Sequence, residues 1–174
     1  MTECYQTEHD TAVGRLTLLA DDGALLACRW SAAPADRLRR AGLRPPHEVA
    51  DPGGHAVLRE AAEQIDAYLA GRTREFTVPV DLRLSTDFGR TVLATLGGVG
   101  YGRTARYGEV AVLAGRPTAA RAVGAALGAN PLCVVLPCHR VLGASGALTG
   151  YAGGVEAKRF LLDLEGGRPA AQVS

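Results

Sequence analysis

Long apolar runs, a signal sequence and paired cysteines are all missing from this sequence of 174 residues. No hydrophobic stretch approaches the roughly 20 residues that a membrane helix needs. The first ten residues, MTECYQTEHD, are polar and mixed in charge, unlike a signal peptide. The four cysteines (Cys4, Cys28, Cys133 and Cys138) show no CxxC spacing, which argues against a zinc cluster or a thioredoxin-type motif. We therefore expect a cytoplasmic protein with reduced thiols.

The net charge is only +1, but the two signs are unevenly distributed. Residues 1–85 hold ten arginines against thirteen acids, a balance of −3, whereas residues 86–174 hold eight arginines and one lysine against five acids, a balance of +4. The segment 103–140 contains one acid and five arginines, at 103, 106, 116, 121 and 140. This cluster indicates either a phosphate-binding surface or a solvated face, and charge alone leaves both open.

The first half has the pattern of a small α+β domain, which we assign to residues 1–83. Two apolar runs, Arg15–Leu19 and Ala24–Trp30, flank Ala-Asp-Asp-Gly and predict a hairpin. A loop rich in Pro, Ala and Gly is expected over 31–54. His55–Ala70 carries apolar residues at helical spacing and ends before Gly71, so it predicts an amphipathic helix. Glu75–Asp81 is predicted to be an edge strand, because Pro79 cannot donate to a ladder.

The second half, residues 84–174, is predicted to be mainly helical. Ser85 or Thr86 can cap a helix that carries Phe88, Val92 and Leu96. Two short helices are expected at Tyr107–Ala114 and Ala119–Leu127, joined by a turn at 115–118, with Thr118 capping the second helix. Such a pair is either a helix-turn-helix or one of the many ordinary antiparallel helix pairs. Residues 166–174 are expected to form a frayed tail.

Cys138 and His139 carry the chemistry that the second half suggests. A free thiol has a pKa of about 8.5 and is a weak nucleophile until it ionises. If Pro137 starts a helix, the amides of its first turn favour the thiolate. His139 points about 100° away on such a helix and would act through a water. The carboxylates that could orient it are Glu156, Asp163 and Glu165. From the dipeptide alone, a buried, inert Cys beside a His remains the alternative.

The surrounding motif favours a nucleophile. Asn130-Pro131, five further residues and then Pro-Cys-His-Arg-Val resemble the active-site signature of the O6-alkylguanine-DNA alkyltransferases, also called methylated-DNA–protein-cysteine methyltransferases. The resemblance is close over roughly residues 86–168 and loose over the first half. It implies an N-terminal α+β domain of ribonuclease H-like fold and a mainly α C-terminal domain with a winged-helix-like helix-turn-helix. It also implies a single-turnover DNA repair transferase without a cofactor.

The resemblance implies a role for each matching residue. Cys138 would accept the alkyl group from O6-alkylguanine, or also from O4-alkylthymine, and His139 would be the base. Glu165 would orient His139, and Asn130 would bond the turn before the active site. Arg121 would fill the gap left by a flipped nucleotide, and Tyr107 would help to rotate its phosphate. The remaining matches line or border the alkyl pocket: Val141, Tyr151, Gly153, Gly154 and Lys158.

Three positions depart from the family pattern, and no metal site is expected. Arg106 stands where many relatives have Ser or Thr, which predicts stronger salt dependence of DNA binding. Cys133 replaces Pro or a small residue near the pocket, and Ala152 replaces a common Ser. Cys4 and Cys28 do not fall where the structural zinc of some relatives has its ligands.

The expected partner is double-stranded DNA with alkylated bases, bound through the minor groove by a protein that is monomeric in solution. Cooperative binding along DNA stays open. Three rival functions remain: a lesion-binding protein of the alkyltransferase-like class, which lacks the acceptor Cys, a sequence-specific transcription regulator, and a Cys–His hydrolase. The regulator leaves PCHRV unexplained, and the hydrolase predicts turnover rather than one reaction per molecule.

Overall fold

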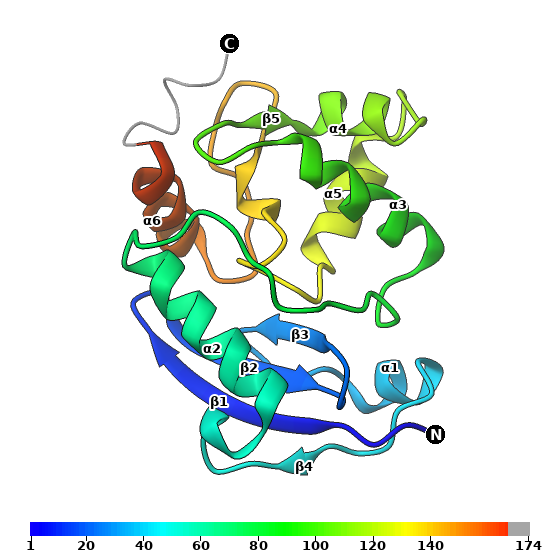
Figure 1. The fold of residues 1–174 in the computed structure, drawn as a ribbon. Helices are drawn as coiled ribbons and strands as arrows, with labels where there is room; N and C mark the ends of the chain where they lie inside the picture. The colour runs from blue at the N-terminus through cyan, green and yellow to red at the C-terminus, as the bar shows by residue number, and fades with distance from the viewer. Residues whose placement is uncertain (167–174) are drawn as a thin grey trace. The chain divides into compact units, whose positions relative to one another are not determined.

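The computed structural model describes residues 1–166, which divide into two compact units: Met1–Leu84 and a second that begins at Ser85 (Figure 1). Each unit has its own secondary structure and core. The α+β class predicted for the first half and the mainly helical class predicted for the second are both confirmed. The tail expected over 166–174 lies outside the described residues, except for Gly166, which ends a helix.

The first unit is built on a four-stranded sheet in the order β3-β2-β1-β4. Its strands are β1 (Tyr5–Thr11), β2 (Gly14–Ala20), β3 (Leu25–Arg29) and β4 (His47–Glu48). Strand β2 pairs antiparallel with both neighbours, and β4 runs parallel to β1. The predicted hairpin is β2–β3. Its turn is closed by the Asp21 carboxylate, which accepts from the amides of Gly23 at 2.9 Å and Ala24 at 2.8 Å.

Helix α2 (Ala56–Leu69) confirms the amphipathic helix predicted for 55–70. Its apolar stripe is buried, with Leu58, Ala61 and Ile65 fully shielded from solvent, and it packs on β1, β2 and β3 (Figure 1). Burial of such a stripe, more than helix propensity, stabilises a helix of this length. The first unit thus has a one-layer sheet covered by one helix.

Two expectations for the first unit were incomplete or wrong. The loop at 31–54 contains helix α1 (Ala35–Arg40), β4 and a 3₁₀ turn, η1 (Pro52–Gly54). Glu75–Asp81 is not a strand and makes only an isolated bridge between Val80 and Leu25. The Gln64 side chain explains the difference, because its Oε1 accepts from the amides of Thr77 at 2.8 Å and Val78 at 3.0 Å. These two backbone N–H groups therefore donate to a side chain of α2 and not to a neighbouring strand.

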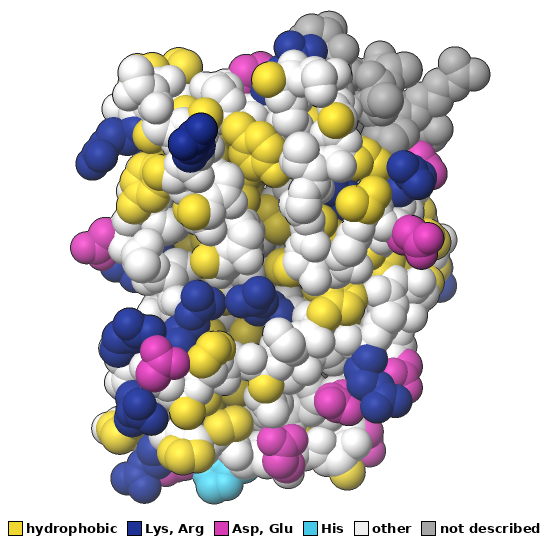
Figure 2. Space-filling view, turned by 180° about the vertical axis from the view of Figure 1, so that it is seen from behind, with side chains coloured by type: hydrophobic (Ala, Val, Ile, Leu, Met, Phe, Trp, Pro, Cys, Tyr) yellow, Lys and Arg dark blue, Asp and Glu magenta, His cyan; other side chains and the backbone are white. Residues whose placement is uncertain are grey.

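Basic side chains also gather in the first unit, despite its net negative charge. In Figure 2 dark blue side chains lie toward the lower left, the side on which α1 is found. There burial and the neighbouring Arg29 and Arg40 lower the pKa of Arg37. The positive charge of the protein is therefore not confined to its second half.

The second unit is mainly helical. Its helices are α3 (Asp87–Thr95), α4 (Tyr107–Leu113), α5 (Ala120–Gly128) and α6 (Val155–Gly166). The 3₁₀ turn η2 (Leu96–Gly98) continues α3. The predicted cap at Thr86 is confirmed, since its hydroxyl accepts from the amide of Gly89 at 3.0 Å. The cap predicted at Thr118 is wrong: Ala119 is the N-cap of α5 and makes no side-chain bond.

A short parallel ladder joins the helix pair α4–α5 to the Cys138 segment. Strand β5 (Ala105–Arg106) directly precedes α4 and pairs with β6 (Val141–Leu142), which follows the turn η3 (Cys138–Arg140). The chain that follows η3 therefore runs beside the segment that leads into α4. Within residues 1–166, no helix combines the length and the apolar character that crossing a membrane requires.

Candidate active site

Asn130 braces the segment that leads to Cys138. Its side chain is fully buried, its Oδ1 accepts from the amide of Leu132 at 2.9 Å, and its Nδ2 donates to the carbonyl of Leu136 at 3.4 Å. One amide side chain thus bonds both ends of the loop 132–136. The structure brings Asn130 to the turn before the active site, where the resemblance expected it.

Two tight turns fold the chain back between Cys133 and Cys138. Val134 has a φ of 71°, and across it the amide of Val135 donates to the carbonyl of Cys133 at 2.8 Å. Pro137 has φ −82° and ψ 57°, and across it the amide of Cys138 donates to the carbonyl of Leu136 at 2.8 Å. Both are three-residue γ-turns, and the first is the strained form, unusual for a β-branched residue. This doubling back carries the chain from Cys133 to Cys138 within a small volume.

Cys138 is nearly buried, with 5% of its surface exposed, yet its thiolate is favoured. A hydrogen bond from Cys133 lowers the pKa of Cys138 most. Asn130 and the positive charge of Lys158 lower it further, against the opposing effect of burial. The expected helix start is only the three-residue turn η3. Side chains and one buried cation, rather than a helix dipole, therefore supply the stabilisation.

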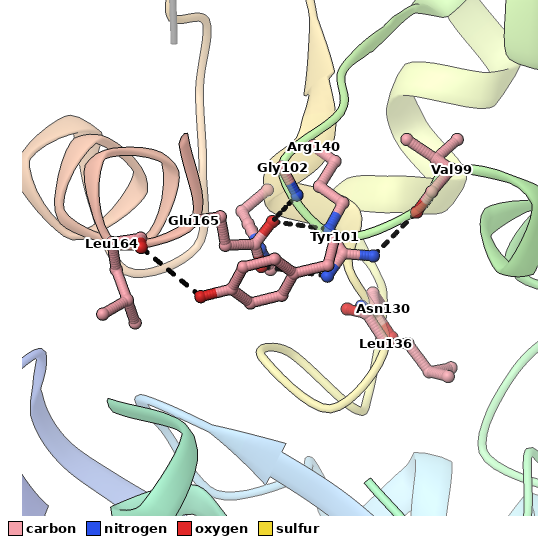
Figure 3. A network of polar contacts seen from close by, with 9 residues as sticks. Val99, Tyr101, Gly102, Asn130, Leu136, Arg140, Leu164 and Glu165 are labelled. Carbon is pink, nitrogen blue, oxygen red and sulfur yellow. Dashed lines mark hydrogen bonds and ion pairs between the residues drawn. The ribbon is translucent and has the colours of Figure 1, made fainter. Parts of the chain in front are cut away.

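His139, Glu165 and Arg140 form a buried polar network, and Figure 3 shows Arg140 and Glu165 with their partners. The Glu165 carboxylate lies 2.9 Å from Nε2 of His139 and accepts two bonds from Arg140, at 2.7 Å to Nε and 3.0 Å to Nη2. Burial lowers the pKa of His139, although Glu165 alone would raise it, and Arg140 adds to the lowering. Because burial outweighs the attraction of the carboxylate, Glu165 orients the imidazole without holding it protonated.

The structure brings one of the three candidate carboxylates to His139. Glu165 lies on the buried side of α6, whereas Asp163 and Glu156 are exposed on the same helix. Glu165 lies two positions after Asp163, so the two side chains point in different directions from the helix axis. The residues alone could not choose between them without the packing of α6, whereas the family resemblance pointed to Glu165.

Arg140 was the residue that sequence reasoning misplaced. We counted it among the basic residues of 103–140, but it is 8% exposed and paired with Glu165. Its Nη1 also donates to the carbonyl of Val99 at 2.7 Å, and its guanidinium lies 5.8 Å from the ring centroid of Tyr101. The amide of Gly102 adds a bond to Glu165 at 3.4 Å (Figure 3). No feature of the local sequence distinguishes this buried arginine from the exposed arginines of the same segment, because its pairing depends on the tertiary packing of α6.

A small cavity of about 20 Å³ borders Cys138. Its lining combines α4, α5, the Cys133–Cys138 segment and the loop before α6: Tyr107, Gly124, Leu127, Gly128, Cys133, Cys138, Gly150, Tyr151 and Ala152. The Tyr107 hydroxyl lies 2.8 Å from Oγ1 of Thr149, a residue that we had not singled out. Cys138, Tyr107 and Tyr151 are therefore brought to one site.

Other predicted pocket residues lie outside the lining of this cavity: Val141, Gly153, Gly154 and Lys158. Lys158 is buried and donates from Nζ to the carbonyl of Val141 at 2.7 Å and to that of Thr149 at 3.5 Å. Burial lowers its pKa to about 8, while Cys138 acts in the opposite direction. Lys158 therefore ties the loop before α6 to β6 and places a charge near the sulfur.

Arg121 is exposed near the start of α5, the second helix of the pair. Arg103 and Arg116 are exposed as well, and Arg106 is half-buried at the start of α4. Across residues 1–166, no group of three or more His, Cys, Asp or Glu side chains is placed to hold a metal ion.

Comparison with known proteins assigns both units. Residues 4–82 match the family model described as the ribonuclease-like domain of 6-O-methylguanine DNA methyltransferase, and residues 87–167 match that of its DNA binding domain. The chain is 43% identical to a methylated-DNA–protein-cysteine methyltransferase of Mycobacterium bovis over 95% of this chain and 94% of the relative. It is 48% identical to the inducible enzyme of that name from Bacillus subtilis, over 62% of this chain and 60% of the relative.

Solved structures agree with this assignment. The crystal structure of Mycobacterium tuberculosis O6-methylguanine methyltransferase superposes with a TM-score of 0.79 at 40% identity, covering 95% of this chain and 94% of that one. A structure of the same organism's protein in complex with DNA superposes with a TM-score of 0.78 at 41% identity, covering 92% of each chain. The similarity thus spans both units.

Proposed function

The chain belongs to the 6-O-methylguanine DNA methyltransferase family, and from this premise we propose that it repairs DNA by transferring the alkyl group of O6-alkylguanine to its own Cys138. The observation that carries the proposal is a nearly buried cysteine, with a lowered pKa, that lines a small cavity beside a His–Glu–Arg network. An inert structural cysteine would have its pKa raised by burial, as Cys4 does.

The reaction is a nucleophilic substitution at the alkyl carbon. The Cys138 thiolate forms the S–C bond while the bond from carbon to O6 of guanine breaks, and the electron pair goes to the base. His139 takes the thiol proton and returns a proton to the leaving guanine. The lowered pKa of His139 suits this function, because a neutral imidazole can accept the proton near pH 7. Glu165 holds the ring in position, and Asn130 braces the turn that presents the sulfur.

The target base has to leave the duplex to reach a nearly buried sulfur, which costs a few kcal/mol. We propose that helix α5 enters the minor groove and that Arg121 occupies the gap in the base stack. Its exposure on α5 supports this role, and stacking of its guanidinium recovers part of the cost. Tyr107, which borders both α5 and the cavity, would turn the phosphate of the extruded nucleotide.

The extruded base would enter the small cavity, which at about 20 Å³ would have to open further to admit it. Tyr151 lines its wall, and the nearby glycines Gly153 and Gly154, which lack side chains, would allow close approach of the base. The backbone of Val141 would read the guanine edge. Lys158 stabilises both that backbone and the thiolate. O4-alkylthymine is a second candidate substrate of the same chemistry.

The product is a thioether, and no residue of the site offers chemistry that would hydrolyse it, so each molecule reacts once. Cys138 separates this chain from a lesion-binding protein of the alkyltransferase-like class, which lacks the acceptor. DNA is the partner that the family and the DNA-bound relative support. We further propose a cytoplasmic protein that acts as a monomer.

A labelling experiment tests the function. The protein is incubated with duplex DNA that carries radiolabelled O6-methylguanine and is then digested. The label is expected on the peptide that contains Cys138, with a plateau at one methyl group per chain even in excess DNA. Cys138→Ser should abolish the transfer while DNA binding is retained. Label that stays on DNA, or free product that accumulates beyond one equivalent, would contradict the proposal.

A further inference from the structure

A second thiol lies beside the acceptor. Cys133 is 1% exposed and lines the same cavity of about 20 Å³ as Cys138. Its sulfur has two acceptors in reach: the carbonyl of Asn130, at 3.5 Å, and the sulfur of Cys138. Alkyl transfer needs only one sulfur, so the proposed function leaves the redox chemistry of this pair unused.

The backbone explains why the two sulfurs meet. The γ-turns at Val134 and Pro137, together with the bridge between Cys133 and Leu136, fold the segment back on itself. A bond from the amide of Leu136 to the carbonyl of Leu132, at 2.8 Å, closes the loop. In an extended chain, side chains five residues apart point to opposite faces. This fold instead directs both into one cavity.

We propose that Cys133 and Cys138 form a reversible disulfide when the protein meets hydrogen peroxide, which protects the acceptor sulfur from irreversible oxidation. In the first step the Cys138 thiolate attacks one peroxide oxygen, the O–O bond breaks, and after protonation water leaves and Cys138 is a sulfenic acid. In the second step the Cys133 sulfur attacks Cys138, the S–S bond forms, and a second water leaves with the thiol proton. Two thiols and one peroxide thus give one disulfide and two waters.

The roles of the two sulfurs follow from their surroundings. Cys138 has the lowered pKa and the nearby Lys158, so it is the sulfur that reacts first with an oxidant. Without a neighbouring thiol, a sulfenic acid proceeds to sulfinic acid, which simple thiols do not reduce. Cys133, already in contact, resolves it first. While the disulfide persists, Cys138 is unable to accept an alkyl group.

The test needs no knowledge of the substrate for its main readout. Reduced full-length protein is exposed to hydrogen peroxide, free thiols are blocked, and the protein is digested with trypsin without reduction. Residues 122–140 contain no Lys or Arg before Arg140, so both sulfurs fall on one peptide that carries no other cysteine. We expect that peptide to carry no blocking group and to have a mass two hydrogens below that of its reduced form. Treatment with dithiothreitol should make both thiols available to the blocking reagent again.

Variants separate a resolving function from a structural one. In Cys133→Ser and Cys133→Ala, peroxide should convert Cys138 to sulfinic acid. After dithiothreitol treatment, the recovered labelling of Cys138 should be at least about tenfold lower in these variants than in wild type. Each protein is compared with its own untreated sample. Cys4→Ala, in the core of the first unit, is the control and should behave as wild type.

Two outcomes would overturn the disulfide. One is that both cysteines are still blocked in peroxide-treated wild type, and the other is that sulfinic acid forms at Cys138 at the same rate with and without Cys133. These outcomes are read by mass spectrometry and do not depend on alkyl transfer. If instead the disulfide forms but reduced protein takes no label from O6-methylguanine DNA, the proposed function fails and the redox inference stands.

Discussion

At the residue scale, the chemistry of the site depends on how four buried charges are balanced in two pairs. Arg140 offsets Glu165, and Lys158 faces the Cys138 thiolate, while burial lowers the pKa of His139 and favours its neutral form. A buried charge is costly without a partner. Each of these side chains therefore affects both the reactivity of the site and the stability of the second unit.

Lys158→Met should lower the reactivity of Cys138 near neutral pH. Removal of the positive charge raises the pKa of the thiol, and a tenfold smaller thiolate fraction is the expected order of the effect. Since the pKa of Lys158 is about 8, the charge is present below that pH and lost above it. The rates of wild type and Lys158→Met should therefore differ most below pH 8 and converge at high pH. The measurement is the rate of Cys138 alkylation by iodoacetamide against pH.

The neighbouring Arg159→Met serves as the control, because Arg159 is exposed on the same helix. An equal loss in both variants, or a loss that is independent of pH, would indicate a structural effect and not an electrostatic one.

Glu165→Gln should both slow the transfer and destabilise the protein. The neutral amide leaves Arg140 without its anionic partner, and breaking a buried pair typically costs about 3–5 kcal/mol. The single-turnover transfer rate and urea unfolding are the two measurements. Asp163→Asn, an exposed acid on the same helix, should change neither. If Asp163→Asn slows the transfer and Glu165→Gln does not, the orienting carboxylate has been misassigned.

The sequence could identify the family, and it could mark Cys138 and His139 as candidate catalytic residues, because the motif is local and specific. Without the family resemblance it could not decide between Glu165 and Asp163, and it could not remove Arg140 from the basic cluster. Both depend on which side of α6 faces the interior, and that is a tertiary property.

At the element scale, the sequence predicted the helices and strands that carry strong local signals and missed those whose signals are weak. Helix α2 and the β2–β3 hairpin follow from periodicity and turn residues. Strand β1, Tyr-Gln-Thr-Glu-His-Asp-Thr, has almost no apolar residues and owes its structure to pairing with β2. Ladder β5–β6 is two residues long and has no sequence signal. The Gln64 side chain overrode a plausible strand at 75–81.

Gly102→Ala should destabilise the second unit by about 1–2 kcal/mol, the cost of a left-handed backbone for an L-residue. Gly102 has φ 76°, and a Cβ would lie 3.1 Å from the carbonyl oxygen of Glu165. The change thus strains the contact with the end of α6. Urea unfolding measures the effect. Gly97→Ala is the matched control, since a Cβ there meets nothing within 4 Å, and it should be neutral or slightly stabilising.

Arg121→Ala should impair repair of duplex DNA more than reaction with a free O6-alkylguanine base. The free base needs no extrusion, so only the duplex reaction loses the side chain that fills the stack. Rates of Cys138 alkylation with both substrates make the comparison. Arg90→Ala, on α3 and paired with Asp87, is the control. Equal losses on both substrates would argue against a flipping function.

At the scale of the whole molecule, a net charge of +1 does not prevent binding to a polyanion, because the charges are segregated. Arg103, Arg106, Arg116 and Arg121 remain available on the second unit, whereas Arg140 and Lys158 are buried. The basic cluster of 103–140 is thus smaller than its composition indicated, and part of it serves the active site.

DNA binding should weaken with salt in proportion to the exposed arginines. Each phosphate contact contributes about −0.9 to the slope of log affinity against log salt concentration, so four contacts give a slope of roughly −3 to −4. Fluorescence anisotropy with undamaged duplex measures the slope. Arg121→Ala should reduce the magnitude of this slope by no more than about 0.9, the contribution of one phosphate contact. A slope near zero would show that these arginines only face solvent.

The ladder between β5 and β6 has a consequence for the lesions that the protein can process. Because it fastens the start of α4 to the residue that follows the reactive turn, the distance between the start of α4 and the Cys138 sulfur is fixed. A damaged base attached to DNA through a longer backbone spacer should therefore still bind through its phosphates. Its alkyl carbon, however, should not align with the sulfur, so it should not react.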